Sequence, residues 1–342
     1  MHEELDGYIS RCRDAVFLHI RAYLERRTAQ LPRSMKTCVV DYPYRRGKAL
    51  RPALIMLFNG AYGGTDAGAV RVAAAYQLLE DWGLGRDDIL DNAVLRRGKP
   101  ALHLLYGLPR AVNALDMLHD CVGDMLYCHC GLSARRYKAV HTIFSEATSV
   151  TLGGQHQDIE AREIPLERFT ERAYLSIAER KTAFYTVVVP CLLGAEMAGA
   201  RGQRGAIREF GRALGTAFQI IDDVLDAEND GSGRFGKAPG NDIREGKRTL
   251  LAAAALRRLG GAKKRRLAAF YALPPEKRSP KMVREIRRDM LASGAPAECR
   301  AKAAKLTAAA LRVFETRLYP AMRGPARDRI RELILKLGDR SF

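Results

Sequence analysis

Apolar positions along the chain recur at helical spacing rather than with the alternation typical of strands. Alanine-rich amphipathic stretches, such as AGAVRVAAAYQLLEDW at 67–82 and KAAKLTAAALRVFETRL at 302–318, predict long helices because alanine has the highest helix propensity. No linker rich in proline, glycine and serine divides the chain, and its apolar content can support a large core. The pattern predicts an all-α protein with a single large helical domain over 1–342.

The most apolar stretch, TAFYTVVVPCLLGAEMAGA at 182–200, is interrupted by Pro190 and Glu196. A buried helix, with a kink allowed at the proline, is therefore favoured over a membrane span. The N-terminus carries Glu3, Glu4 and Asp6 before only a short apolar run, which argues against a signal peptide. We expect a cytoplasmic protein.

An acidic motif lies in WGLGRDDILDN at 82–92. Asp87 and Asp91 are four residues apart, so a helix places them on one face, with Asp88 beside them. Like charges this close repel one another, and the arrangement needs a basic side chain, a metal ion or solvation by water. Taken alone, the motif is more typical of a solvated acidic turn.

The same spacing recurs in FQIIDDVLDAEND at 218–230, where it places Asp222, Asp223 and Asp226. Apolar neighbours such as Ile221 and Val224 predict a largely buried helix here. Buried carboxylates are costly without a partner, so three together imply a strong cationic counterpart. Mg²⁺ is a hard ion that binds through a few carboxylates plus substrate phosphates. The second copy therefore favours a Mg²⁺ site.

Three basic groups accompany the acidic motifs: Lys48 and Arg51 in RRGKALRP at 45–52, Arg96 and Arg97 in LRRGKP at 95–100, and Lys237 and Lys247 in FGKAPGNDIREGK at 235–247. Any one such group is more typical of solvated surface. Here the basic groups lie next to the acidic motifs. Carboxylates can hold Mg²⁺ and arginines can make bidentate contacts with phosphate, so the combination indicates a diphosphate site rather than solvated surface.

The chain resembles the trans-isoprenyl diphosphate synthases, the polyprenyl synthetase family, in a series of motifs and in their order. These are GKALRP, DDILDNAVLRRGKPALH, GGQHQD, KTA, FQIIDDVLD and FGKAPGNDIREGKRTL. The match covers about residues 45–250 and leaves a basic helical region at 251–342. The resemblance implies an isoprenoid synthase-type helical bundle with a central active-site cavity. It also implies a homodimer that condenses isopentenyl diphosphate with an allylic diphosphate.

The resemblance assigns a role to each matching residue. Metal ligation is expected of Asp87, Asp91 and Asp222, with Asp88, Asp223 and Asp226 as further ligands or as acceptors for bound water. The residues expected around the departing allylic diphosphate are Arg96, Lys181, Lys237 and Lys247. Those expected around the diphosphate of isopentenyl diphosphate are Lys48, Arg51 and Arg97. Thr182 and Gln219 would offer oxygen dipoles to the carbocation, or else satisfy buried polar groups, and Gln155 with Asp158 would support the metal shell.

Two positions depart from the family pattern. Seven residues before Asp87 the family commonly has a histidine that helps to hold isopentenyl diphosphate, whereas this chain has Glu80, and Arg86 replaces a second histidine. A carboxylate cannot donate a hydrogen bond unless it is protonated. Either Glu80 pairs with Lys48, Arg51 or Arg86, or the second substrate binds differently.

Gly83 and Gly85 weaken the helix before the first acidic motif by roughly 2 kcal/mol relative to alanine, which implies a packing or functional reason. Without a side chain at 83, a prenyl tail could pass close to the backbone, while Trp82 could wall off the pocket. Large aromatic residues at that position limit chain length in the family, so we expect C15 to C20 products. The alternative is that Trp82 belongs simply to the core or an interface.

Three other functions stay open: a longer-chain polyprenyl diphosphate synthase, a class I terpene cyclase and a non-catalytic partner subunit. A cyclase does not need GKALRP and RRG to hold a second diphosphate, and a silent subunit would be expected to have eroded acidic motifs. The presence of all these groups favours condensation.

The chain carries 57 Lys and Arg against 39 Asp and Glu, a formal charge of +18. Much of this charge lies in RRLGGAKKRRLAAF at 257–270 and the rest of the C-terminal third, where no nucleic-acid recognition motif is found, so nucleic acid is not expected as a partner. The basic field would attract diphosphates and allow peripheral membrane contact. The seven cysteines form no disulfide framework and are expected to be reduced.

Overall fold

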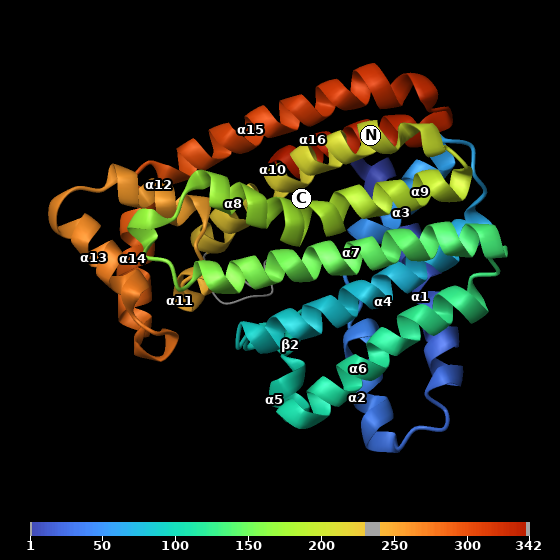
Figure 1. The fold of residues 1–342 in the computed structure, drawn as a ribbon, viewed down its shortest axis with the longest axis horizontal. Coiled ribbons are helices and arrows are strands. Elements are labelled where there is room, and N and C mark those ends of the chain that lie inside the picture. The colour runs from blue at the N-terminus through green and yellow to red at the C-terminus, as the bar shows by residue number, and fades with distance from the viewer. Residues whose placement is uncertain (1, 230–239, 340–342) are drawn as a thin grey trace. The chain divides into compact units, whose positions relative to one another are not determined.

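The computed structural model describes residues 2–229 and 240–339, and these residues are almost entirely helical (Figure 1). They form sixteen α-helices, short π- and 3₁₀-helical segments and one two-stranded hairpin, which confirms the all-α prediction. None of the described helices combines the length and apolar character needed to cross a membrane.

The described residues form two compact units. Unit 1 is built from the described residues of 1–146, 189–207 and 316–333, and unit 2 from those of 147–188, 208–315 and 334–342. The helices that belong in part to each unit are α7 (Ala134–Ala161), α10 (Arg204–Glu228) and α16 (Gly324–Asp339). The single domain over 1–342 stays a prediction.

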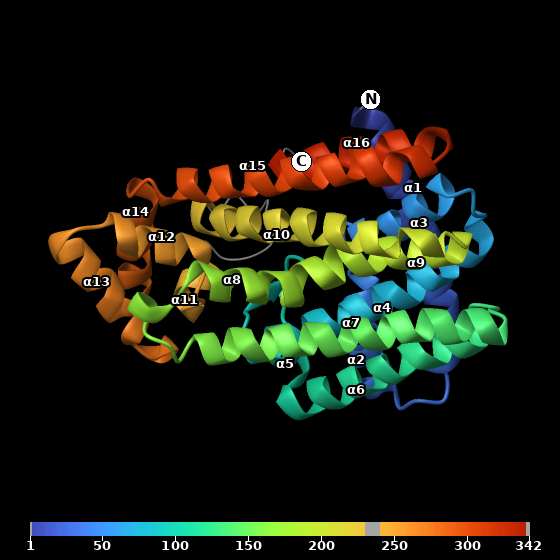
Figure 2. The same ribbon diagram turned by 45° about the horizontal axis from the view of Figure 1, so that its top comes forward.

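Unit 1 is centred on α3, whose residues from Pro52 to Asn59 are all buried. Helix α3 packs against α9 and α4, and α4 also packs against α1 and α6 (Figures 1 and 2). The remaining elements of this unit are the small hairpin and the short helices around it. The bounds in unit 1 are α1 (His2–Arg27), α2 (Arg33–Tyr44), α3 (Leu50–Ala61), α4 (Asp66–Leu90), β1 (Leu95–Arg96), β2 (Lys99–Pro100), α5 (Leu102–Tyr106), α6 (Leu108–Asp124), a π-helical segment (Met125–His129) and α9 (Val189–Ala198).

Unit 2 has a core between α10 and a group of C-terminal helices. Helix α12 is buried from Leu250 to Leu256 and packs against α14 and α15, and α13 packs against α14 (Figure 1). Ile220, Ile221 and Val224 of α10 join the same core, which confirms the largely buried helix predicted around the second acidic motif. The bounds are α8 (Glu171–Ile177), a π-helical segment (Ala178–Val188), α11 (Asn241–Glu245), α12 (Leu250–Arg258), α13 (Gly261–Ala272), α14 (Pro280–Ala292) and α15 (Ala295–Val313).

The apolar stretch at 182–200 forms a buried helix, as predicted. Its conformation changes from π-helix to α-helix at Val189, one residue before Pro190. Proline lacks the N–H that an α-helix interior requires, and its ring clashes with the carbonyl four residues earlier. Helix distortions are found both at prolines and at π-helical turns, and the two adjoin here.

Gly194 of α9 lies directly against α3. A Cβ atom at this position would lie 2.4 Å from the Ile55 carbonyl oxygen and 2.7 Å from Phe58 Cβ, closer than real Cβ contacts. Because the first of these atoms is backbone, rotation of a side chain cannot relieve the clash. Gly194 therefore sets the distance between the two helices.

We expect Gly194→Ala to lower the free energy of unfolding by about 1–3 kcal/mol, since it overpacks a tight core. Gly123→Ala is the matched control, because Gly123 is an exposed residue of α6 and a Cβ atom there would have no neighbour within 4 Å. Alanine at 123 should leave stability unchanged or raise it by up to about 1 kcal/mol. Urea denaturation measures both, and equal effects of the two substitutions would contradict this account of Gly194.

Candidate active site

The first acidic motif lies in the last turn of α4, which has Asp91 as its C-cap. Three carboxylates here face the negative end of the helix dipole, which is unfavourable without a nearby cation. Arg96 supplies the cation: its Nε lies 3.0 and 2.9 Å from the two carboxylate oxygens of Asp88, and its Nη2 lies 3.9 Å from Asp87 Oδ2. Burial alone would lower the pKa of Arg96, but Asp88 and Asp87 raise the pKa overall.

The hairpin that carries Arg96 turns through Arg97 and Gly98, whose φ angles are +52° and +73°. Positive φ at both central residues is what a type I′ turn requires. Glycine adopts it without strain, whereas an arginine does not. The side chain of Arg97 is held on both sides, because its Nη1 donates to the Tyr42 carbonyl oxygen at 2.9 Å and its Nη2 to Asp81 Oδ1 at 2.7 Å.

The loop between α2 and α3, which carries RRGK, lies against this hairpin. Arg45 donates to the carbonyl oxygens of Arg96 and Pro100, both at 2.9 Å. A Cβ atom at Gly47 would lie 2.9 Å from Arg97 Nη2, so a side chain here would require the Arg97 guanidinium to shift. The non-glycine residues with positive φ in the described chain all lie in or beside these two loops: Arg46, Ala49, Asn92 and Arg97. Backbone strain of this kind tends to concentrate at functional sites.

Tyr42 completes the surroundings of Asp88 and was not identified from the sequence. Its hydroxyl donates to Asp88 Oδ2 at 2.6 Å and accepts from the Leu102 backbone N–H at 3.2 Å. Asp88 is fully buried, with its oxygens engaged by Arg96 and Tyr42. It anchors the hairpin to α4 and α2 in this structure, and its contribution to metal binding stays a prediction.

Glu80 pairs with Arg51, one of the three partners considered for it, at 2.7 Å between Oε1 and Nη1. The next residue, Asp81, accepts from Arg97 and, at 3.3 Å, from Gln77. Burial raises the pKa of Asp81 to about 6, although Arg97 opposes the shift. Asp81 was not among the predicted site residues, because nothing in its local sequence distinguishes it from a solvated acid.

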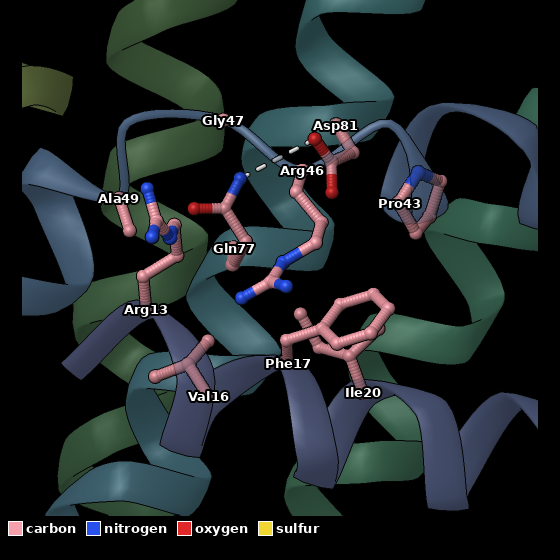
Figure 3. A pocket seen from close by; sticks show the side chains of 10 residues that line it. All are labelled: Arg13, Val16, Phe17, Ile20, Pro43, Arg46, Gly47, Ala49, Gln77 and Asp81. Atoms are coloured by element: carbon pink, nitrogen blue, oxygen red, sulfur yellow. Dashed lines mark hydrogen bonds between the residues drawn. The ribbon is translucent and has the colours of Figure 1, made fainter. Parts of the chain in front are cut away.

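Asp81 and Gln77 lie at a small cleft of about 20 Å³ between α1, α4 and the loop that carries Gly47 (Figure 3). Phe17 of α1 and Ala49 also line it. Its volume suits one or two water molecules. The cleft is too small for a prenyl diphosphate, so it marks the underside of the loop rather than a substrate pocket.

The two glycines before the first acidic motif have different surroundings. A Cβ at Gly85 would lie 2.4 Å from a methyl carbon of Leu115 on α6, so this glycine permits close helix packing. Nothing lies within 4 Å of a Cβ at Gly83. Trp82 is buried and its ring centroid lies 4.4 Å from that of His119 on α6. Gly83 therefore has room for a side chain, whereas Trp82 packs against α6, and the chain-length hypothesis stays a prediction.

The second acidic motif lies on α10 in unit 2, with Asp223 buried. Asp223 accepts from the Tyr174 hydroxyl at 2.7 Å and from Gln219 Nε2 at 2.6 Å. The Thr182 hydroxyl donates to Gln219 Oε1 at 2.6 Å, so a chain of hydrogen bonds runs from Thr182 through Gln219 to the carboxylate. Tyr174 is the partner that the sequence did not indicate.

The predicted lysines of unit 2 lie beside carboxylates. Lys181 Nζ is 2.7 Å from Asp158 Oδ2, and Lys247 Nζ is 3.2 Å from Asp242 Oδ1. Burial would raise the pKa of Asp158, but the lysines and Arg162 hold it below its ordinary value. Gln155 lies on α7, as Asp158 does, whereas Lys237 lies outside the described residues.

Negative charge is concentrated around the second motif. Burial raises the pKa of Asp223 well above its ordinary value, and the nearby charges of Asp242 and Asp222 raise it further. Asp226 Oδ2 accepts from the Asp242 backbone N–H at 3.0 Å. Within residues 2–229 and 240–339, however, no three acidic, histidine or cysteine side chains are grouped closely enough to hold a metal ion by themselves.

Comparison with known proteins agrees with these motifs. Residues 33–290 match the family model described as polyprenyl synthetase. A short chain isoprenyl diphosphate synthase of Methanothermobacter thermautotrophicus is 34% identical over 235 residues, which are 68% of this chain and 70% of that protein. Farnesyl diphosphate synthase of Bacillus subtilis is 31% identical over 73% of this chain and 84% of its own length.

The fold also matches a solved structure of geranylgeranyl pyrophosphate synthase from Corynebacterium glutamicum, complexed with isoprenyl diphosphate and magnesium. The two chains are 26% identical, the match covers 98% of this chain and 99% of that one, and the TM-score is 0.86. This confirms the predicted isoprenoid synthase fold. The chain therefore belongs to the polyprenyl synthetase family and is a trans-prenyltransferase.

Proposed function

We propose that the protein condenses isopentenyl diphosphate with an allylic diphosphate to give a trans-prenyl diphosphate of C15 to C20. The observation that carries this proposal is the cluster at the end of α4, where Asp87 and Asp88 lie beside Arg96 and Asp91 caps the helix. Carboxylates for a metal ion and a guanidinium for phosphate within a few ångströms of each other suit a diphosphate leaving group. The relatives described above support the same reaction class.

The donor set fits Mg²⁺, and Asp87, Asp91 and Asp222 would hold it, with Asp226 adjoining. All are carboxylate oxygens, which Mg²⁺ prefers. Burial and the nearby carboxylates of Asp242 and Asp222 raise the pKa of Asp223, which supports a cation in this part of α10. Mg²⁺ commonly uses only one or two carboxylates together with substrate phosphates and water. That habit agrees with the lack of a complete three-residue metal site among the described residues. When bound, the metal supplies Lewis-acid stabilisation of the departing diphosphate.

Basic side chains would take up the charge that develops on the leaving group. Arg96 would do this at the first motif, and Lys181 and Lys247 at the second, where they lie beside carboxylates of unit 2. Thr182 and Gln219 would direct oxygen dipoles toward the allylic carbocation, and Gln155 with Asp158 would orient the metal's surroundings. Lys48, Arg51 and Arg97 would hold isopentenyl diphosphate, whose double bond attacks the cation.

We further propose a homodimer and peripheral contact with membranes through the basic region at 251–342.

Asp87→Ala and Asp222→Ala should each lower turnover by orders of magnitude while leaving helical content nearly unchanged, because each removes a charged ligand rather than core volume. Removal of divalent metal with EDTA should abolish activity, and Mg²⁺ should restore it. Asp116→Ala on the exposed face of α6 is the matched control and should retain activity. The measurement is incorporation of labelled isopentenyl diphosphate with each allylic primer. Near-normal turnover in either site variant would refute the metal assignment.

Product length provides a separate test, since Trp82 packs on α6 and Gly83 borders open space. Trp82→Ala opens a cavity where a chain stop is proposed, so products should become longer, and Gly83→Phe should shorten them. Trp82→Phe keeps an aromatic wall and should preserve the wild-type length. Chromatography of the dephosphorylated products measures this. Identical lengths from wild type and a folded, active Trp82→Ala variant would show that Trp82 is not the floor of the pocket.

A further inference from the structure

The two arginines proposed to hold isopentenyl diphosphate are each paired with a carboxylate of α4. Arg51 Nη1 lies 2.7 Å from Glu80 Oε1, and Arg97 Nη2 lies 2.7 Å from Asp81 Oδ1. The side chains of Arg51 and Glu80 are only 17% and 10% exposed, and those of Arg97 and Asp81 only 14% and 1% exposed. Ion pairs this well shielded from water are strong. Both arginines therefore have a counter-ion within the protein.

These carboxylates nearly balance the positive charge of the subsite. Lys48, Arg51 and Arg97 carry three positive charges, and Glu80 and Asp81 carry two negative ones, so the formal sum is one positive charge. A diphosphate brings several negative charges. It would find one net positive charge and two buried carboxylates beside the guanidinium groups it should contact. Like charges placed this close in a binding site oppose binding.

The two pairs differ in how firmly they are fixed. Asp81 also accepts from Gln77 at 3.3 Å beside the loop of Gly47 (Figure 3). Arg97 is held in addition by the Tyr42 carbonyl oxygen, so several bonds fix this pair. Glu80 is held less firmly. Its Oε2 is buried, yet none of the residues that the structure describes donates a hydrogen bond to it. Of the two counter-ions, Glu80 is therefore the one that an incoming anion can displace more easily.

We propose that Glu80 is a specificity-determining residue: it occupies Arg51 as a built-in counter-ion, and the diphosphate of the second substrate must displace it. The proposal rests on the proposed function, in that it takes isopentenyl diphosphate as the ligand of this subsite. Compared with a protein that has an uncharged residue at position 80, this protein should bind isopentenyl diphosphate more weakly and the allylic diphosphate equally well. A glutamine of the same shape has no charge to repel phosphate, and its amide N–H groups can donate to phosphate oxygens.

The test is equilibrium binding by calorimetry with Mg²⁺ present and each diphosphate added alone, so that no condensation occurs. Glu80→Gln should bind isopentenyl diphosphate at least tenfold more tightly than wild type, whereas its affinity for geranyl diphosphate should change by less than about threefold. Glu276→Gln removes the same charge at an exposed position of unit 2 and should change neither affinity. In steady-state assays, Glu80→Gln should lower KM for isopentenyl diphosphate and leave kcat nearly unchanged.

Glu80→His provides a second variant, should the glutamine variant not fold, and it should also bind isopentenyl diphosphate more tightly. Circular dichroism confirms the fold of each. Unchanged or weaker binding in a folded Glu80 variant would overturn the proposal, because Glu80 would then be neutral for the ligand or would position Arg51 to receive it. Because binding is measured apart from turnover, a failure of this proposal can be distinguished from a failure of the proposed reaction. An inactive wild type whose Glu80→Gln variant still binds more tightly would sink the proposed reaction and leave the counter-ion inference standing.

Discussion

The buried contact between Asp88 and Arg96 is the interaction on which the arrangement around the first acidic motif depends. Asp88 has no exposure to water and lies at the negative end of the α4 dipole, so it requires a cation. The hairpin brings Arg96 to it, and the tight turn that makes this possible places Arg97 in a left-handed conformation. Tyr42 of α2 then satisfies the same carboxylate. One need for charge compensation thus ties α2, α4 and the hairpin together.

The same helix face repeats this arrangement two turns earlier. Glu80 and Asp81 precede Asp87 and Asp88 by seven residues, a spacing that returns to the same side of a helix. Asp81 pairs with Arg97, the neighbour of the arginine that pairs with Asp88. Consecutive arginines in one turn therefore contact carboxylates two helical turns apart. The carboxylates of Glu80, Asp81, Asp87 and Asp88 lie on the same side of α4. A change in the charge of any one of them therefore alters the electrostatic environment of the other three.

The helical fold and the association of acidic with basic motifs were predictable from the sequence, because both follow from residue spacing and charge. The tyrosines that donate hydrogen bonds to the buried carboxylates were not predictable from the sequence. Tyr42 lies 46 residues from Asp88, and Tyr174 lies 49 residues from Asp223. Both occupy helix positions typical of ordinary core, so no local signal marks their hydroxyls. Likewise, helix propensity assigns the same cost to Gly83 and Gly85, and only packing against Leu115 distinguishes them.

The two acidic motifs share their spacing but differ in how their charge is compensated. At the first, the buried central carboxylate receives the full positive charge of Arg96. At the second, the described residues that donate to the equivalent Asp223 are the neutral Tyr174 and Gln219, and burial raises its pKa well above the ordinary value. Hydrogen bonds from neutral groups offset less of a buried charge than a guanidinium does. The charge of the first motif is thus compensated within the protein by Arg96. Among the described residues no guanidinium bonds to Asp223, so its buried carboxylate depends on hydrogen bonds from neutral groups.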